Sequence, residues 1–347
     1  MHLRRLAFVA ALLVVTLDAR AWDYNGHRIV NQLALAGLPD DFPAFVKTPE
    51  AAARIAFLAG EPDRWRNISD LPLRHENSPD HYLDMEGLDD AGIPLDKLSE
   101  FRYVFVAQLS AARATHPEKF AAINSDKNKD HVRELIGFLP WAITENYGKL
   151  KSAFSYLKAY EQYGTPDEIA NARANAIYIM GVMGHYVGDG AQPLHTTKHT
   201  NGWVGSNPHH YTTWTRFHGW IDGGYIAQIK LTEADLEPRA KPARVLETPA
   251  SPPPTERDPV FTDVLAYLAA SHARVELLYR LDQTGALKPD APDSVTAPGR
   301  VFIGEQLLRG GEMLSSLWLT AYRRATPDTY LRAQLLKRQS ETATPDT

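Results

Sequence analysis

The stretch 184–199, GHYVGDGAQPLHTTKH, brings three histidines and one aspartate close together in the chain. His185 and Asp189 are four residues apart, so on a helix their side chains lie on one face, one turn apart. His195 comes after Pro193, which cannot continue the helical hydrogen-bond ladder. We therefore expect His185 and Asp189 to converge from one helical face, and His195 to reach the same cleft from a turn.

A second pair, His218 and Asp222 in RFHGWID, has the same four-residue spacing. The chain has no cysteine, so a bound metal must be held by His, Asp, Glu or backbone atoms. Imidazole and carboxylate are the ligands that zinc favours when thiolate is absent. A single His–Asp pair is more often a structural hydrogen bond, but two pairs together with His195 favour a metal site. Further candidates are Asp63 in GEPDRW, His81 in DHYLD and His27 in WDYNGH.

The elements that position these residues are predicted to be helices, because apolar residues recur at three- and four-residue spacing and strand signals are sparse. The segment 165–189 shows this best. Thr165 suits an N-cap, Pro166 suits the first helical position, and acidic residues follow in the first turn. Its second half is apolar on nearly every side, as in a buried helix. We predict an all-α fold: one mostly helical domain over 22–325, with a buried central helix beside a metal cleft.

Two segments are predicted to lie outside the packed helices. Residues from about 237 to 259 are rich in proline and charge, and flanking helices of similar character indicate a surface loop rather than a domain boundary. Residues 326–347 are predicted to form a polar, disordered tail.

Residues 1–21 have the three parts of a secretory signal peptide: the basic MHLRR, the apolar LAFVAALLVVTL and the small-x-small ARA. The apolar run is short for a membrane span. We expect cleavage before Trp22 and a secreted or periplasmic protein without stable membrane anchoring. The chain has 37 Lys and Arg against 42 Asp and Glu, a net charge of −5. Such a surface does not attract nucleic acid or anionic lipid at long range.

The order and spacing of these residues resemble the S1/P1 nuclease family, within the zinc-dependent nuclease and phospholipase C superfamily. That family has an N-terminal Trp with a His five residues on, and an Asp followed three residues later by Arg. It then has His-aromatic-aliphatic-Asp, His-x3-Asp-x5-His with QPLH, and a last His-x3-Asp. The most specific match is HYVGDGAQPLH. The matching residues are Trp22, His27, Asp63, Arg66, His81, His185, Asp189, His195, His218 and Asp222.

The resemblance implies a helical domain of the phospholipase C/P1 nuclease type that binds three zinc ions. One zinc would be bound by Asp63, His81, His185 and Asp189. Its partner would be bound by the α-amino nitrogen and carbonyl oxygen of Trp22, by His27, and by the other oxygen of Asp189. A third, set apart, would be bound by His195, His218 and Asp222.

The resemblance also implies hydrolysis of single-stranded nucleic acid, and of 3′-nucleotides, by a metal-activated water that attacks phosphorus. Asp63 would orient the nucleophile and Arg66 would clamp the phosphate. Tyr82 would stack on a base while Asp84 hydrogen-bonds its edge. The alternatives are that Arg66 is a surface arginine, and that Tyr82 and Asp84 support the core and the ligands.

Two other functions stay open. A zinc phospholipase C that acts on phospholipid head groups would use the same cluster, but in that branch the first His lies farther from the Trp and the last ligand is usually Glu. His27 and Asp222 therefore favour the nuclease branch. A zinc-binding protein without catalysis is the alternative of another class. The chain departs from fungal and plant nucleases in having no disulfides and in having Arg216 and Trp220 around His218.

Overall fold

The computed structural model describes residues 24–246, 257–288 and 290–343. Every regular element within these ranges is a helix, and none of the described residues forms a strand. The prediction of an all-α domain is confirmed. The expected signal peptide, 1–21, and Trp22 lie outside the described residues. Within those ranges, no helix combines the length and the hydropathy needed to cross a bilayer.

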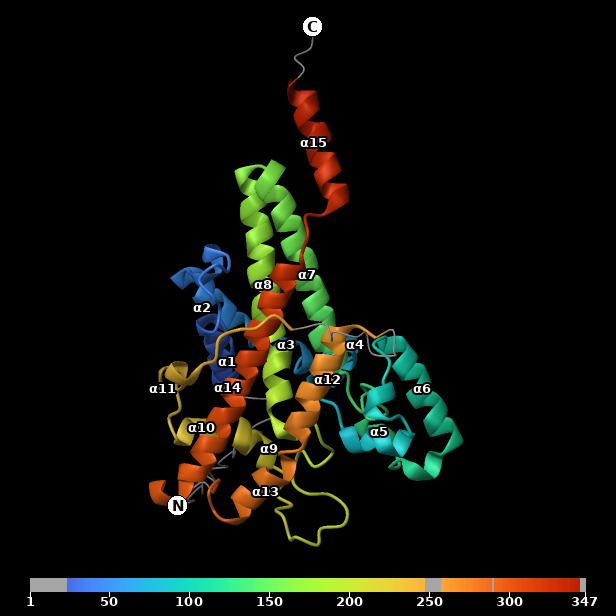
Figure 1. The fold of residues 1–347 in the computed structure, drawn as a ribbon. Helices are drawn as coiled ribbons and strands as arrows, with labels where there is room; N and C mark the ends of the chain where they lie inside the picture. The colour runs from blue at the N-terminus through green and yellow to red at the C-terminus, as the bar shows by residue number, and fades with distance from the viewer. Residues whose placement is uncertain (1–23, 247–256, 289, 344–347) are drawn as a thin grey trace, which may run out of the picture.

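Two long helices, α7 (Leu139–Tyr163) and α8 (Pro166–Ala191), form a hairpin at the centre of the fold (Figure 1). The hairpin turns at Thr165, whose hydroxyl accepts a hydrogen bond from the Glu168 backbone N–H while the Glu168 carboxylate accepts one from the Thr165 backbone N–H. This capping box fixes where α8 begins. From Met180 to Ala191 every residue of α8 is buried. The predicted central buried helix is therefore present.

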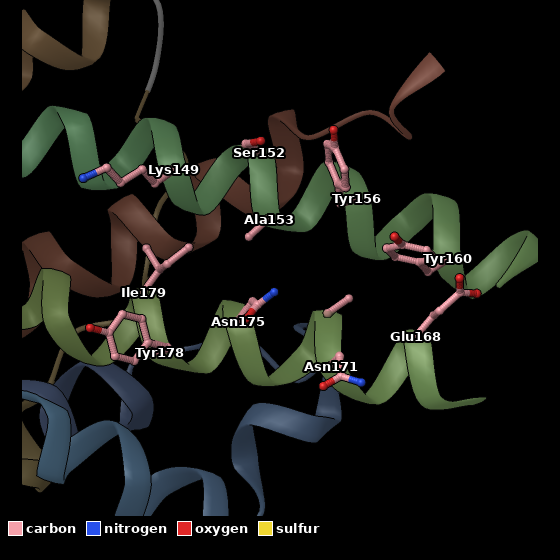
Figure 2. Close-up of a pocket in the computed structure, with 11 residues that line it drawn as sticks. Lys149, Ser152, Ala153, Tyr156, Tyr160, Glu168, Asn171, Asn175, Tyr178 and Ile179 are labelled. Atoms are coloured by element: carbon pink, nitrogen blue, oxygen red, sulfur yellow. The ribbon is translucent and has the colours of Figure 1, made fainter. Parts of the chain in front are cut away.

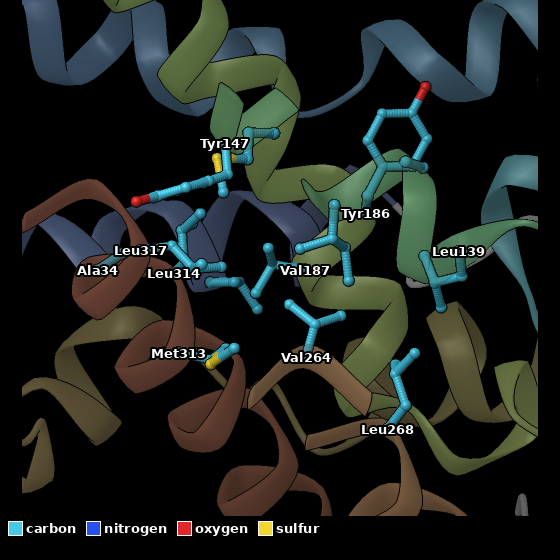
Figure 3. Close-up of a cluster of buried hydrophobic side chains, with 14 of the residues drawn as sticks. Ala34, Leu139, Tyr147, Tyr186, Val187, Val264, Leu268, Met313, Leu314 and Leu317 are labelled. Carbon is cyan, nitrogen blue, oxygen red and sulfur yellow. The ribbon is translucent and has the colours of Figure 1, made fainter. Parts of the chain in front are cut away.

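Four further helices enclose α8. They are α1 (Tyr24–Ala36), α2 (Pro49–Leu58), α12 (Pro259–His272) and α14 (Asp293–Arg324). Figure 3 shows apolar side chains from α1, α7, α8, α12 and α14 meeting in one cluster. Burial of such side chains is the main favourable term in folding, so this cluster stabilises the position of α8. The labelled members include Ala34, Tyr147, Tyr186, Val187, Val264, Leu268, Leu314 and Leu317.

Shorter elements carry or border the remaining predicted site residues. After α2 come α3 (Glu61–Arg66), α4 (Leu71–Asn77), the 3-10 turn η2 (Ser78–His81), α5 (Met85–Ala91) and α6 (Arg102–Thr115). After α8 come the 3-10 turn η6 (Pro193–His195), α9 (Phe217–Gly219), the π-helix η7 (Trp220–Gly224), α10 (Tyr225–Gln228) and α11 (Glu233–Leu236). The helix α13 (Val275–Gln283) lies between α12 and α14.

The proline-rich segment begins with a short 3-10 turn at Glu237–Arg239, and residues 240–246 then run beside α1 and α14. The Ala243 backbone N–H donates to the Gly37 carbonyl at 2.8 Å, and the Leu246 N–H donates to the Thr320 hydroxyl at 2.9 Å. Residues 247–256 lie outside the described residues.

The C-terminal tail differs from the expectation of disorder, because Thr329–Ala343 form the helix α15. The Asp328 carboxylate accepts a hydrogen bond from the Leu331 backbone N–H at 2.7 Å, which caps the first turn. Leu335 is buried, and Arg338 donates to both carboxylate oxygens of Glu168 at 2.8 and 2.9 Å. These contacts fasten α15 to the tip of the α7–α8 hairpin (Figure 1).

Candidate metal centre

Three groups of buried histidine and aspartate side chains lie around the second half of α8. Within each group the nitrogen and oxygen atoms that could bind a metal lie within 4.8 Å of one another. Each predicted ligand among the described residues falls into one of these groups. The groups are His27, Asp63 and His185; His81, His185 and Asp189; and His195, His218 and Asp222.

The rings of His27 and His185 stack with their centroids 3.7 Å apart, although α1 and α8 are far apart in the sequence. Asn31, one turn after His27, donates its amide N–H groups to the carbonyls of Ile55, at 2.8 Å, and Gly181, at 3.1 Å. It thereby ties α1 to both α2 and α8. A Cβ on Gly184 would lie 1.6 Å from Asn31 Oδ1, so only glycine permits this approach. We call this contact between α1 and α8 the Asn31–Gly184 lock; no sequence pattern predicted it.

Asp189 belongs to the second group and also lies close to His27 of the first group. Its Oδ2 lies 3.0 Å from His81 Nδ1 and 3.4 Å from His185 Nε2, while its Oδ1 lies 3.5 Å from His27 Nε2. The two oxygens of one carboxylate therefore face different sets of imidazoles. This is the arrangement that a bridging carboxylate requires.

Two histidines are held in defined tautomers. His185 Nδ1 donates to the Ala59 carbonyl at 2.6 Å, so in the neutral ring Nε2 keeps its lone pair and faces His81 Nδ1 at 2.9 Å. His195 Nδ1 donates to the His81 carbonyl at 2.5 Å, so its Nε2 lone pair faces His218 Nε2 at 3.0 Å. A hydrogen bond from the second ring nitrogen is typical of metal-binding histidines, because it fixes the orientation of the ring.

The third group lies at the end of α8. His218 Nε2 is 2.7 Å from Asp222 Oδ2, and His195 Nε2 is 4.0 Å from the same oxygen. Gln192 is fully buried beside them: its amide donates to Asp222 Oδ1, and its carbonyl accepts from the Leu194 backbone N–H at 2.9 Å. Gln192 belongs to the QPLH motif, but the sequence alone indicates no role for its side chain.

Several polar atoms of these groups are buried without a hydrogen-bond partner in the described structure. A buried polar atom without a partner is costly and rare in folded proteins. A cation between the groups would satisfy these atoms, so the residues fit metal ions. The unpaired atoms include both ring nitrogens of His27, His81 Nε2 and Asp189 Oδ1.

Burial also sets the protonation of the metal-free site. It lowers the pKa of His27, His81 and His195 well below the ordinary value for imidazole, and that of His185 to about 4. These rings are therefore neutral and able to bind a metal at neutral pH. Burial raises the pKa of the Asp189 carboxyl well above its usual range. A metal-free Asp189 is costly to ionise, and a nearby cation removes that cost.

The predicted catalytic pair lies on one turn of α3. Arg66 Nε is 2.7 Å from Asp63 Oδ1, and Asp63 Oδ1 is 3.9 Å from His185 Nε2. The Arg66 Nη2 atom is buried and has no hydrogen-bond partner in the described structure. The side chain is nearly buried rather than a free surface arginine, and its guanidinium group pairs with Asp63 of the first group.

The segment with Tyr82 and Asp84 runs beside the turn that carries His195. The Leu83 backbone N–H donates to the His195 carbonyl at 2.9 Å. Both Tyr82 and Asp84 are half-buried. Burial, together with the neighbouring Glu86, raises the pKa of Asp84 to about 7. The structure therefore places both residues next to the segment of a candidate ligand.

The last histidine of the 184–199 stretch belongs to none of the three groups. His199 is buried, and its ring stacks on Trp203 with the centroids 3.8 Å apart. Its Nδ1 accepts a hydrogen bond from the Val204 backbone N–H at 3.1 Å. His199 thus stabilises the long loop between His195 and His218, whereas His209 and His210 are exposed.

Two cavities adjoin these helices. A groove of about 480 Å³ lies between α7 and α8, where Tyr156, Tyr160 and Tyr178 line it together with polar side chains (Figure 2). None of the candidate ligands described above lines this groove. A second cavity of about 380 Å³ reaches Asp63 and is bordered by Tyr24. The second cavity, and not the tyrosine-lined groove, adjoins the candidate metal centre.

The sequence matches no protein-family model, and no curated protein matches it.

Proposed function

We propose that this protein is a secreted, zinc-dependent phosphodiesterase of the S1/P1 nuclease type, which hydrolyses single-stranded nucleic acid and 3′-nucleotides. The observation that carries the proposal is the buried Asp189 carboxylate, with one oxygen 3.0 Å from His81 and the other 3.5 Å from His27. A carboxylate shared in this way suits two adjacent metal ions, and paired metal sites are typical of phosphodiester hydrolysis.

Zinc bound in the three groups would supply Lewis acidity, which lowers the pKa of a water molecule and offsets negative charge on a phosphate. The chain's own residues would do the rest. Asp63, held at 2.7 Å by Arg66 Nε, would orient the attacking water and accept its proton. The unpaired Nη2 of Arg66 would donate to a phosphate oxygen.

Completion of the paired site depends on the N-terminus. His27 lies in the first turns of α1, and Trp22 stands five residues before it in the sequence. We propose that cleavage before Trp22 frees an α-amine, which joins His27 as a ligand. Such an amine has an ordinary pKa near ~8, so a dication can displace its proton near neutral pH.

A substrate screen of the zinc-loaded protein tests the proposal. We expect cleavage of single-stranded DNA or RNA and release of phosphate from 3′-AMP, both lost on chelation and restored by zinc. Fast release of choline phosphate from phosphatidylcholine without nucleic-acid cleavage would instead establish a phospholipase C. Zinc binding without turnover of any of these substrates would establish a non-catalytic zinc protein.

Replacing Arg66 with lysine is expected to lower kcat/KM by roughly 10²-fold, the effect of removing one positioned donor to a developing charge. Lysine keeps the charge but loses the planar fork, so zinc content should not change. Arg64→Lys is the matched control, because Arg64 lies on the same helix and pairs with Glu61 at the surface. Equal activities of the two variants, measured on the same substrate, would rule out the phosphate clamp.

Replacing Asp84 with asparagine is expected to change stability in a pH-dependent way. A carboxyl whose pKa is about 7 in the folded protein, against about 4 in an unfolded chain, binds its proton more tightly when folded. The wild type therefore loses stability as the pH rises from about 4 to about 7. Asp84→Asn should raise Tm at pH 8 relative to the wild type and have little effect at pH 4. An identical Tm difference at both pH values would contradict this.

A further inference from the structure

We infer that Gln192 is a positioning residue that selects which oxygen of Asp222 is offered to a metal ion, and that it thereby controls occupancy of the third group, His195, His218 and Asp222. The inference rests on the proposed zinc centre. It concerns a side chain that would not itself bind the metal.

The two ends of the Gln192 amide are distinguished by their partners. The carbonyl oxygen accepts the Leu194 backbone N–H at 2.9 Å, so the other end must be the NH₂ group. That NH₂ group donates to Asp222 Oδ1. The side chain is fully buried, so water does not compete for either hydrogen bond.

This donation leaves one defined oxygen of Asp222 for a metal. With Oδ1 bound by Gln192, Oδ2 lies 2.7 Å from His218 Nε2 and is buried without another hydrogen-bond partner in the described structure. A free carboxylate could turn either oxygen towards the imidazoles. The Gln192 amide favours one orientation, and such outer contacts tune metal affinity.

The same amide also fixes a second ligand of the group. By accepting the Leu194 N–H it caps the 3-10 turn Pro193–His195, whose last residue is the ligand His195. Gln192 therefore links the chain segment of His195 to the carboxylate of Asp222, 30 positions later. Both hydrogen bonds of its side chain serve the third group, whereas His185 of the paired groups is oriented by the Ala59 carbonyl.

Two substitutions separate these roles. Gln192→Met keeps the side-chain length and loses both hydrogen bonds. Gln192→Glu keeps an oxygen for the Leu194 N–H but replaces the donor with a carboxylate that repels Asp222. Gln306→Met is the matched control, because Gln306 is an equally buried glutamine whose amide donates within its own helix to the Phe302 carbonyl at 3.2 Å.

The test is zinc titration of each metal-free protein after export and cleavage, with Trp22 verified as the first residue by mass spectrometry. The metal-to-protein ratio is then measured after desalting. We expect three zinc ions in the wild type and in Gln306→Met. In both Gln192 variants, affinity for one zinc should fall roughly 10- to 100-fold, which leaves two after desalting. Circular dichroism of the metal-free proteins reports whether each variant folds, and Gln192→Glu decides the question if Gln192→Met does not.

The outcomes distinguish this inference from the proposed function. A wild type that binds no zinc, or fewer than three ions, refutes the proposed centre itself. A wild type with three ions and Gln192 variants with three ions of unchanged affinity refute the inference alone. Loss of zinc in Gln192→Met but not in Gln192→Glu would mean that Gln192 only caps the 3-10 turn. It would refute the inference that Gln192 orients the Asp222 carboxylate.

Discussion

Replacing Asp189 with asparagine is expected to remove the paired metal ions and to lower phosphodiesterase activity by at least roughly 10³-fold, the scale of losing a main electrostatic element of a site. Asparagine matches aspartate in size but is neutral and has a single oxygen. It cannot face His81 with one oxygen and His27 with the other, as Asp189 does at 3.0 and 3.5 Å.

The same substitution should not lower the stability of the metal-free protein. Because burial raises the Asp189 pKa well above its usual range, the folded protein binds that proton more tightly than the unfolded chain. Stability of the metal-free wild type is thus lost as the pH rises from about 4 towards the raised pKa. Asparagine removes this loss, so metal-free Asp189→Asn should be at least as stable as the wild type at pH 7.

Thermal unfolding with and without zinc, together with metal analysis, checks both expectations. Zinc should raise the Tm of the wild type, since a ligand at about 100 times its Kd stabilises by about 2.7 kcal/mol, and should raise that of Asp189→Asn much less. Asp282→Asn is the control: Asp282 is buried and pairs with Lys288 at 3.0 Å in another part of the fold. Full activity in Asp189→Asn would refute the bridged metal pair.

Replacing Gly184 with alanine is expected to destabilise the protein by at least about 2 kcal/mol, within the range for overpacked cores. Helix propensity alone predicts the opposite, because alanine is favoured over glycine inside a helix by about 1 kcal/mol. The new Cβ would meet Asn31 Oδ1 at 1.6 Å. Asn31 would have to move, which releases α1 from α8 and separates His27 from His185.

Denaturant unfolding of two alanine variants tests this. Gly148 lies exposed in the interior of α7, where an added methyl group would meet only open space, so Gly148→Ala should gain up to about 1 kcal/mol. The double variant Asn31→Ala with Gly184→Ala should lose less unfolding free energy than the two single variants lose together, because the new Cβ no longer clashes with Asn31. A stabilised Gly184→Ala protein would show that the two helices are not locked at this point.

The sequence could predict the parts of the fold and site that depend on residues close together in the chain. Thr165, Pro166 and the acidic first turn mark the start of α8, and the four-residue spacing of His185 and Asp189 places them on one face of it. The four-residue spacing of His218 and Asp222 also brings them together, although η7 turns as a π-helix there.

The parts that sequence could not predict depend on contacts between distant segments. The Asn31–Gly184 lock joins α1 to α8, and no pattern near either residue signals the other. The C-terminal tail is a second example of a structure that depends on a distant segment. Its polar composition indicated disorder, but the buried Leu335 and the pairing of Arg338 with Glu168, 170 positions earlier, give α15 a surface to pack on.

The docking of α15 has a practical consequence for handling the protein. Glu168, where Arg338 binds, and His185 are on the same helix, and at 1.5 Å per residue they are separated by roughly 25 Å. A label or a solid support attached after α15 would therefore sit at the opposite end of the hairpin from the metal groups. Immobilisation or fluorescent tagging at this end should leave the cavity at Asp63 open.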